Sequence, residues 1–258
     1  MSTLSTMKLN TGAEMPALGL GTWRLSGDAC ERAVEWALEI GYRHIDTAAM
    51  YRNEAAVGAG VRASGVPRED IFITTKLAGG DHRRARDAAR DSVERLDLDY
   101  VDCYLIHWPA GNGADLDVWQ VLEELQSDGT LRAIGVSNYS VGQLVELLDT
   151  ADVPPAVNQV EMNPFVQPRD IEQTCHERGV AVQAYTPLGR AADLDNRPLV
   201  DVSHRLGRSA AQVMLRWGLQ RGAAVLPKSG NRERLAANAE IFDFELSTDD
   251  MAVVDALG

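Results

Sequence analysis

The chain has 258 residues, enough for one large domain, and its 45% hydrophobic and 24% charged content is that of a soluble globular protein. With 38 acidic and 25 basic residues it carries a net charge of −13, which argues against nucleic acid or an anionic membrane as a main partner. Its three cysteines, Cys30, Cys103 and Cys175, are widely spaced, which indicates a reducing compartment and argues against a disulfide framework or a zinc site.

The N-terminal region is predicted to form a β-hairpin. Residues 1–10 are polar and lack the apolar segment of a signal peptide, and no run approaches the ~18 apolar residues of a membrane span. We therefore expect a cytoplasmic protein without a membrane partner. Over residues 7–15, Asn10-Thr-Gly-Ala13 separates two short apolar flanks, a pattern typical of a hairpin turn.

From residue 17 onward, apolar segments alternate with amphipathic ones. Strands are predicted at residues 17–22, 42–47, 71–76, 100–106, 131–136, 156–160, 180–185 and 223–226. Helices are predicted at residues 29–40, 54–63, 83–96, 115–127, 141–149, 169–178, 198–206, 209–221, 231–239 and 248–256. Asp28 and Ser209 are the expected caps of the first and eighth of these helices.

The predicted strands are apolar almost throughout, as strands buried on both faces are. Strand–helix alternation predicts parallel pairing, and eight such units in a chain of this length predict a closed (β/α)8 TIM barrel of the α/β class, preceded by the β-hairpin. An open doubly wound sheet is the alternative architecture. Because no segment rich in proline, glycine or serine interrupts the alternation, residues 1–258 are expected to form one barrel domain.

Four polar residues lie at or just after the ends of the second, third and fourth predicted strands. They are Asp46, Tyr51, Lys76 and His107. In a barrel the carboxyl ends of the strands meet at one rim, where active sites lie. Each residue taken alone has a structural interpretation, such as a helix-capping aspartate or a core histidine. Their recurrence at successive strand ends favours a shared site.

These four side chains suit the reduction of a carbonyl group. Hydride addition places negative charge on the carbonyl oxygen, which then needs a proton donor. A free phenol titrates near ~10, and a neighbouring ammonium lowers that pKa. We therefore expect Tyr51 to act as the acid, Lys76 to lower its pKa, Asp46 to hold Lys76, and His107 to orient the carbonyl through a hydrogen bond.

A cofactor must supply the hydride, yet the usual dinucleotide-binding fingerprint is missing. Gly19-Leu-Gly-Thr-Trp-Arg24 lacks the last glycine, and Gly58-Ala-Gly-Val-Arg-Ala63 fits the pattern but lies inside a predicted helix, so both are expected to serve backbone packing. A better candidate for cofactor binding is the segment that follows the eighth strand and begins the next helix, a place where barrels often bind phosphate. Its candidate donors are Lys228, Ser229 and Arg234. A solvated helix start is the alternative interpretation.

His44 and Asp46 form a His-x-Asp pair on one predicted strand, which is a possible start of a metal site. No further cluster of histidine, aspartate or glutamate completes a ligand set in the sequence. We therefore expect His44 to lie in the core and no metal to be bound.

The motifs, taken in order, closely resemble those of the aldo-keto reductase superfamily across nearly the whole chain, and most of all the bacterial 2,5-diketo-D-gluconate reductases. The matching segments are Gly41-Tyr-Arg-His-Ile-Asp-Thr-Ala48 with Tyr51, Thr75-Lys76, Leu105-Ile-His-Trp-Pro109, Ile134-Gly-Val-Ser-Asn138, Asn158-Gln159, Ala184-Tyr-Thr-Pro-Leu-Gly189 and Pro227-Lys-Ser229. The resemblance implies a (β/α)8 barrel that binds NADPH in an extended form without a Rossmann domain. It also implies a catalytic tetrad of Asp46, Tyr51, Lys76 and His107.

The same resemblance implies which residues contact each ligand. The nicotinamide carboxamide would be held by Ser137, Asn138 and Gln159, and Tyr185 would stack on the ring. The 2′-phosphate would be bound by Lys228, Ser229 and Arg234, and the adenine by Asn238. The remaining cofactor contacts would be Gly21, Thr22, Asp46 and Leu188. The substrate pocket would be lined by Trp23, Met50, Tyr51, His107 and Trp108.

Departures from the family pattern bear on specificity and affinity. Ala78-Gly-Gly80 stands where the family often has a pocket tryptophan, and the loops after His107 and Gly189 are short. They predict a wider, less selective site and loose closure over the cofactor. Ala237 stands where many relatives carry a glutamate that contacts adenine, whereas Arg234 keeps the preference for NADP over NAD.

The expected function is therefore the NADPH-dependent reduction of aldehydes, ketones or diketo sugars by a monomeric enzyme whose partner is a small carbonyl substrate. A catalytically weak, NADPH-binding regulatory protein on the same fold is the alternative, since a fold does not determine a function.

Overall fold

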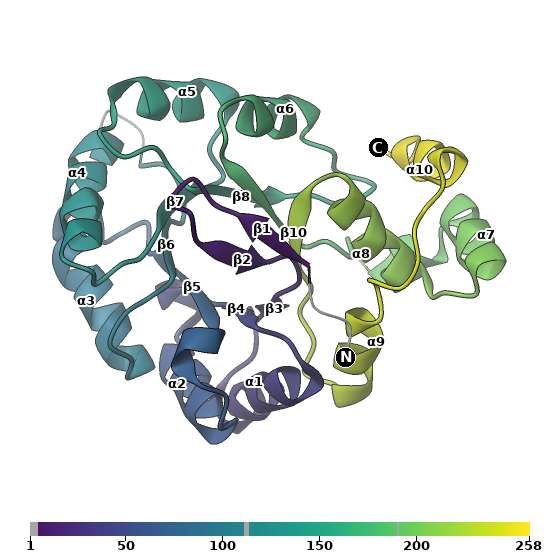
Figure 1. Cartoon of the computed structure of the whole chain (residues 1–258), viewed down its shortest axis with the longest axis horizontal. Helices are drawn as coiled ribbons and strands as arrows, with labels where there is room; N and C mark the ends of the chain where they lie inside the picture. The colour runs from purple at the N-terminus through teal and green to yellow at the C-terminus, as the bar shows by residue number, and fades with distance from the viewer. Residues whose placement is uncertain (1–4, 111–113, 190) are drawn as a thin grey trace.

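The computed structural model describes residues 5–110, 114–189 and 191–258. Within these ranges, eight parallel strands pair in chain order into one sheet (Figure 1). The strands are β3 (Leu20–Gly21), β4 (His44–Asp46), β5 (Phe72–Leu77), β6 (Cys103–Ile106), β7 (Ile134–Ser137), β8 (Val157–Glu161), β9 (Ala181–Tyr185) and β10 (Ala223–Leu226). Parallel bridges from Leu18 to Val225 and from Gly21 to Lys228 join the first strand to the last. The sheet thus closes into the predicted (β/α)8 TIM barrel, and the open doubly wound sheet is excluded.

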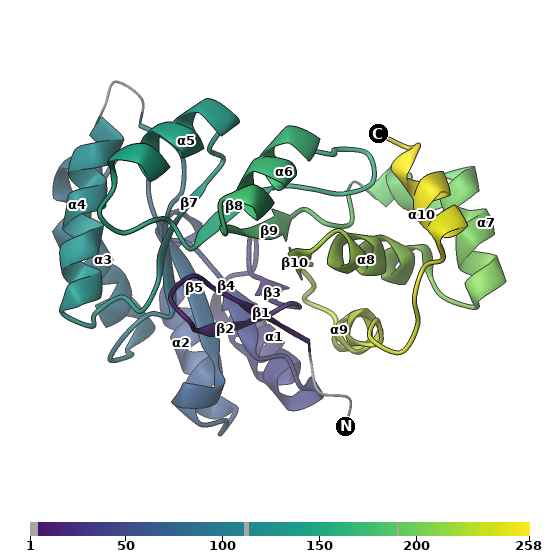
Figure 2. The same ribbon diagram turned by 45° about the horizontal axis from the view of Figure 1, so that its top comes forward.

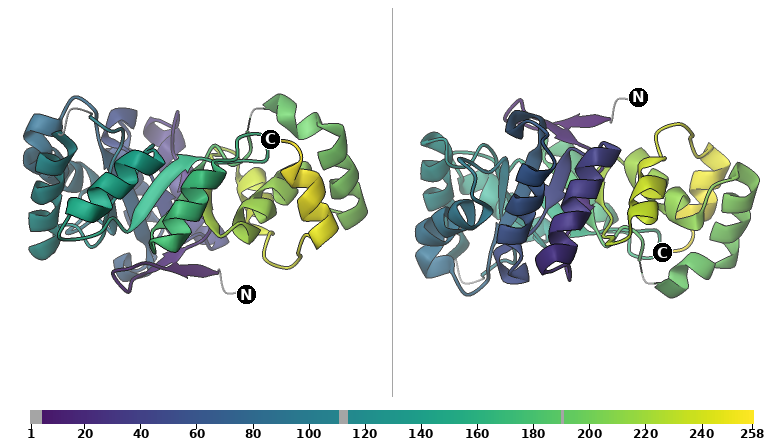
Figure 3. Two further views of the ribbon diagram at one scale, coloured as in Figure 1. Left: turned by 90° about the horizontal axis from the view of Figure 1, so that it is seen from above. Right: turned by 90° about the horizontal axis from the view of Figure 1, so that it is seen from below.

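Helices surround the barrel (Figures 1 and 3). They are α1 (Gly27–Ile40), α2 (Glu54–Ala63), α3 (Ala85–Leu96), α4 (Ala114–Ser127), α5 (Val141–Thr150), α6 (Arg169–Glu177), α7 (Arg197–Leu206), α8 (Ala210–Gln220), α9 (Arg232–Ala239) and α10 (Thr248–Asp255). Helix α1, for example, buries an apolar stripe that includes Ala33, Val34 and Ala37 at helical spacing. The outermost pair, α7 and α10, lies beside α8 at one side of the molecule (Figure 2).

The predicted hairpin is present as the antiparallel strands β1 (Thr6–Lys8) and β2 (Glu14–Pro16). Its Met15 is fully buried and clusters with apolar residues from the first halves of the barrel strands, among them Phe72, Cys103 and Val157. The hairpin therefore covers the N-terminal end of the barrel, as the side views show (Figure 3). The carboxyl ends of the strands lie at the opposite end.

Gly58 and Gly60 allow neighbouring helices to pack closely. A Cβ atom on Gly58 would lie 1.8 Å from the carbonyl oxygen of Leu96 at the end of α3, and one on Gly60 would lie 2.6 Å from the carbonyl oxygen of Glu31 in α1. The G-x-G-x-x-A pattern thus serves helix packing, as predicted, and not a dinucleotide.

Some predicted boundaries are wrong in detail. Helix α1 begins after Ser26, so Asp28 lies in its first turn and favours the helix dipole without capping it. Tyr51 ends a separate 3-10 turn, Ala49–Tyr51, that precedes α2. Ser209 caps α8 through a capping box, as expected. In the described part of the chain, no helix is long and apolar enough to cross a membrane.

Candidate active site

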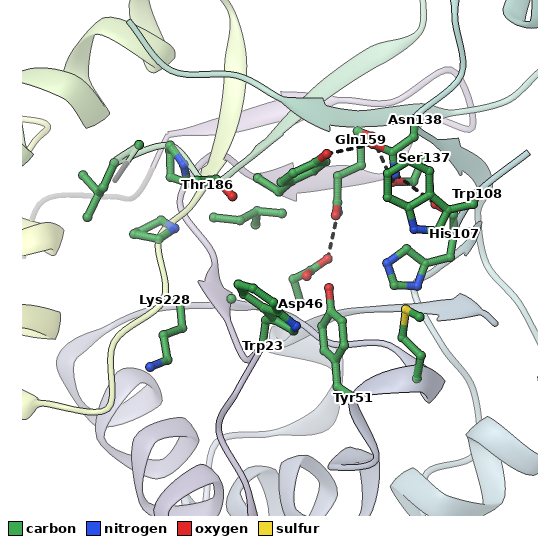
Figure 4. Close-up of a pocket in the computed structure, with 18 residues that line it drawn as sticks. Trp23, Asp46, Tyr51, His107, Trp108, Ser137, Asn138, Gln159, Thr186 and Lys228 are labelled. Carbon is green, nitrogen blue, oxygen red and sulfur yellow. Dashed lines mark hydrogen bonds between the residues drawn. The ribbon is translucent and has the colours of Figure 1, made fainter. Parts of the chain in front are cut away.

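A cavity of about 460 Å³ opens at the carboxyl ends of the barrel strands (Figure 4). It is lined by most of the residues expected to touch a ligand, namely Gly21, Trp23, Asp46, Met50, Tyr51, His107, Trp108, Ser137, Asn138, Gln159, Tyr185, Leu188 and Lys228. Its wall also includes Thr186, Pro187, Gly189, Leu226 and Pro227, for which we predicted no role.

Lys76 is completely buried and pairs with Asp46. Its Nζ donates to both carboxylate oxygens of Asp46 at 2.8 Å and to the carbonyl oxygen of Thr47 at 2.7 Å. Burial alone would lower the pKa of Lys76, but the charge of Asp46 and the proximity of Tyr51 outweigh it, so the pKa is raised. A fixed ammonium group therefore lies behind the cavity wall.

Tyr51 and His107 both point into the cavity (Figure 4). The Tyr51 ring centroid lies 5.2 Å from Nζ of Lys76 and 5.7 Å from the His107 ring centroid, with the two rings nearly perpendicular. The Trp108 ring stacks on the His107 ring, with a centroid separation of 6.5 Å. An ammonium, a phenol and an imidazole are thus grouped at one wall.

The protonation states of Tyr51 and His107 follow from burial. Burial raises the pKa of Tyr51, and the charge of Lys76, which lowers this pKa as expected, offsets the effect of burial only in part, so the pKa is raised. Burial lowers the pKa of His107 to about 3, with the nearby Lys76 charge adding to the effect. At neutral pH the site therefore holds a protonated phenol and a neutral imidazole.

A hydrogen-bonded network forms the wall that faces Tyr51. The Asn138 side-chain nitrogen donates to the His107 carbonyl oxygen and to Ser137 Oγ, both at 3.0 Å, and Asn138 Oδ1 accepts from the Tyr185 hydroxyl at 2.9 Å. Ser137 Oγ donates to the carbonyl oxygen of Gln159 at 2.9 Å. These polar groups are therefore held in place before any ligand arrives.

The expected phosphate donors lie at or beyond one end of the cavity. Lys228 lines the end away from Tyr51 (Figure 4) and is exposed. The Ser229 hydroxyl is occupied by a turn, since its Oγ accepts from the Asn231 backbone nitrogen at 3.1 Å. Arg234 is exposed in the first turn of α9. In the described part of the chain, neither the Lys228 nor the Arg234 side chain has a hydrogen-bond or ion-pair partner.

Two other predicted cofactor residues do not line the cavity. Asn238 is buried in α9. Thr22 is buried, and its hydroxyl donates to the carbonyl oxygen of Asp46 at 2.9 Å. Thr22 therefore joins the loop that carries Trp23 to the strand that carries Asp46.

His44 lies in the core. Its Nδ1 lies 3.2 Å from the carbonyl oxygen of Pro16 and its Nε2 lies 2.9 Å from Thr74 Oγ1, and burial lowers its pKa to about 4. Over residues 5–110, 114–189 and 191–258, no group of three or more histidine, cysteine, aspartate or glutamate side chains has an arrangement suited to a metal.

Two residues that we had not predicted support the site. The Asn53 side chain accepts from the Thr47 hydroxyl at 2.7 Å and donates to the carbonyl oxygens of Thr22 and Leu25, each at 2.9 Å. Gln183 is the second and is bonded to Gln159 inside the barrel. The sequence did contain a sign of this role, because Gln183 is a polar residue in a strand predicted to be buried on both faces.

Comparisons with known proteins agree with this geometry. The sequence model of the Aldo/keto reductase family matches residues 17–258. The chain is 46% identical over 255 residues to a glyoxal reductase of Bacillus subtilis (strain 168), an alignment that covers 98% of this chain and 92% of the relative. It is also similar to the crystal structure of an aldo/keto reductase from Brucella melitensis, with a TM-score of 0.97 and 38% identity over 100% of this chain and 99% of the other.

A further solved structure was determined with a ligand. It is a Bombyx mori aldo-keto reductase in complex with NADP, with a TM-score of 0.92 and 34% identity over 100% of this chain and 94% of the other. Fold, cavity and sequence comparisons agree, and the chain belongs to the aldo/keto reductase family.

Proposed function

We propose that this aldo/keto reductase, an NADP-dependent oxidoreductase, reduces small aldehydes, ketones and dicarbonyl compounds with Tyr51 as the general acid. The observation that carries the proposal is the grouping of Tyr51 with the buried Lys76 ammonium and the neutral His107 at one cavity wall. A protonated phenol beside a fixed positive charge can release its proton to an oxygen that is becoming negative.

The residues would act as follows on a bound carbonyl compound. NADPH, when bound, supplies the hydride that forms the new C–H bond. Tyr51 gives its phenolic proton to the carbonyl oxygen, so an O–H bond forms as the phenol O–H bond breaks. Lys76 compensates the charge left on the phenolate, which later regains a proton from solvent. His107 donates an N–H hydrogen bond to the same carbonyl oxygen, because its lowered pKa leaves one ring nitrogen protonated.

The cavity has donors and acceptors suited to the cofactor. In the described part of the chain Gln159 Oε1 has no hydrogen-bond partner, and Lys228 carries an uncompensated charge at the far end. We assign the carboxamide to Ser137, Asn138 and Gln159, and the nicotinamide ring to Tyr185. The remaining assignments are Lys228, Ser229 and Arg234 to the 2′-phosphate, Asn238 to the adenine, and Gly21, Thr22 and Leu188 to further contacts.

The substrate would bind among three large apolar side chains at the cavity mouth. Trp23, Met50 and Trp108 are 53%, 51% and 49% exposed, although they line the same cavity. Grouped, exposed apolar side chains mark a binding site more often than a passive surface. The similarity to a glyoxal reductase supports small dicarbonyl compounds as substrates, and we include diketo sugars such as 2,5-diketo-D-gluconate because they present the same reactive group.

The test is the oxidation of NADPH, followed at 340 nm, by purified protein with glyoxal, methylglyoxal or 2,5-diketo-D-gluconate. We expect absorbance to fall only when both protein and a carbonyl compound are present. The rates across the three compounds would rank the substrate classes. Binding of NADPH, seen as quenching of tryptophan fluorescence, without turnover of any of the three would contradict the proposal and favour the regulatory alternative.

A further inference from the structure

Gln183 lies in the middle of β9, completely buried, in a strand whose other interior residues are apolar. It is the register partner of Gln159 on β8, so their side chains project to the same side of the sheet. Gln159 lines the ligand cavity and Gln183 does not. Gln183 can therefore affect a ligand through Gln159, to which its side chain is hydrogen-bonded.

A chain of hydrogen bonds crosses the barrel interior from Asp46 to the hairpin. Gln159 Nε2 donates to Asp46 Oδ1 at 2.8 Å and to Gln183 Oε1 at 2.7 Å. Gln183 Nε2 in turn donates to the thioether sulfur of Met15 at 2.9 Å. The chain therefore joins the ionised Asp46–Lys76 pair to a residue at the opposite end of the barrel.

The acceptor groups determine which way the side-chain amides of Gln159 and Gln183 are oriented in this series of hydrogen bonds. An amide nitrogen has two protons, and both protons of Gln159 are used, one by Asp46 and one by Gln183. If the Gln159 amide were rotated by half a turn, its oxygen would face Asp46 Oδ1 and Gln183 Oε1, which are both acceptors. A thioether sulfur can accept but cannot donate, so Met15 favours the orientation in which Gln183 presents its oxygen to Gln159.

We infer that Gln183 is a positioning residue which, together with Asp46, holds the Gln159 amide with its oxygen toward the cavity. In this orientation Gln159 offers an acceptor and no donor to a bound ligand. The ligand group that fits is the N–H of a carboxamide, so the inference rests on the proposed function and adds a cause for nicotinamide recognition. Met15 extends this role to the N-terminal hairpin.

The experiment compares the binding of two oxidised cofactors by fluorescence titration. One is NADP⁺ and the other is its 3-acetylpyridine analogue, in which a methyl group replaces the carboxamide nitrogen and no N–H remains. We expect the wild-type protein to prefer NADP⁺ by about tenfold, the effect of one buried hydrogen bond. Gln183→Leu keeps the side-chain size but removes one of the two acceptors of the Gln159 amide nitrogen, so the preference should fall to about threefold or less, because Asp46 alone then orients the amide.

Two further variants separate this role from packing. Gln183→Glu is buried, so it carries a protonated carboxyl group whose carbonyl oxygen can still accept from Gln159, and it should retain the wild-type preference. Gln183→Met lacks a strong acceptor and should lose the preference as Gln183→Leu does. It also serves as the test if Gln183→Leu does not fold, which circular dichroism would show.

The inference would be overturned if folded Gln183→Leu and Gln183→Met kept the wild-type preference for NADP⁺ over the analogue. It would also be overturned if all three variants, including Gln183→Glu, lost that preference. The proposed function fails in a different way. In that case the wild-type protein itself would not bind NADP⁺ or would not oxidise NADPH with any carbonyl compound.

Discussion

Replacing Lys76 with methionine should strongly destabilise the protein. The change removes three hydrogen bonds, to both oxygens of Asp46 and to the Thr47 carbonyl, from a pair whose side chains are 0% and 6% exposed. It leaves a buried carboxylate whose remaining side-chain donor is Gln159. Loss of one partner of a buried ion pair costs about 3–5 kcal/mol, because the other charge stays desolvated. In a chain of this size that corresponds to a fall in melting temperature of roughly 6–20 °C.

The assay is urea unfolding followed by circular dichroism, at pH 8 and at pH 5. The free energy of unfolding of the variant, compared with that of wild type at each pH, gives the cost of removing the Lys76 ammonium.

Two comparisons make the result decisive. Arg84→Met breaks an exposed pair with Asp91, in which the side chains are 60% and 45% exposed, and should cost at most about 1 kcal/mol. The double variant Lys76→Met with Asp46→Leu removes both buried charges and should be more stable than Lys76→Met alone. A Lys76→Met protein within about 1 kcal/mol of wild type would refute this reasoning.

Three further predictions concern the cofactor, pH and packing. Arg234→Ala should weaken NADPH binding by about 10- to 100-fold and leave NADH binding unchanged. The control Arg232→Ala removes an ion pair with Glu39 and should change the binding of neither cofactor. Equal losses of NADPH and NADH binding in Arg234→Ala would contradict the assignment of Arg234 to the 2′-phosphate. The pKa of His107 is about 3 and that of the Tyr51 phenol is raised, so kcat/KM for reduction should stay level through neutral pH. It should fall only at alkaline pH, as the Tyr51 phenol loses its proton. A change of slope in the pH profile near pH 6.5 would contradict a neutral His107 imidazole. Gly58→Ala should cost about 1–3 kcal/mol or more in urea unfolding, while Gly142→Ala in α5, where a Cβ meets nothing within 4 Å, should be neutral or stabilising.

Much of the fold was predictable because strand burial and helix amphipathicity are local properties of the sequence. Eight apolar segments alternating with amphipathic ones predict the barrel, and the structure confirms it. Helix starts were less predictable. Asp28 was taken for a cap because a carboxylate suits that position, but the backbone enters the helix two residues earlier. The separate 3-10 turn that ends at Tyr51 was not predicted either.

The site was predictable in its residues and less so in its electrostatics. Strand ends predict that Asp46, Lys76 and His107 meet at one rim, and the cavity lies there. Lys76 lowers the pKa of Tyr51 as predicted, but the sequence does not show how strongly burial raises it, and burial outweighs the Lys76 charge. The bond between Gln183 and Met15 joins residues 168 positions apart and could not be inferred from spacing.

The central claim is that Tyr51 donates the proton in carbonyl reduction. The most direct measurement is the kcat of Tyr51→Phe with saturating NADPH and glyoxal, paired with the Kd of the variant for NADPH. We predict a fall in kcat of about 10²- to 10⁴-fold with an unchanged Kd, because phenylalanine keeps the ring and removes only the proton donor. A kcat that stays within about tenfold of wild type would contradict this role for Tyr51.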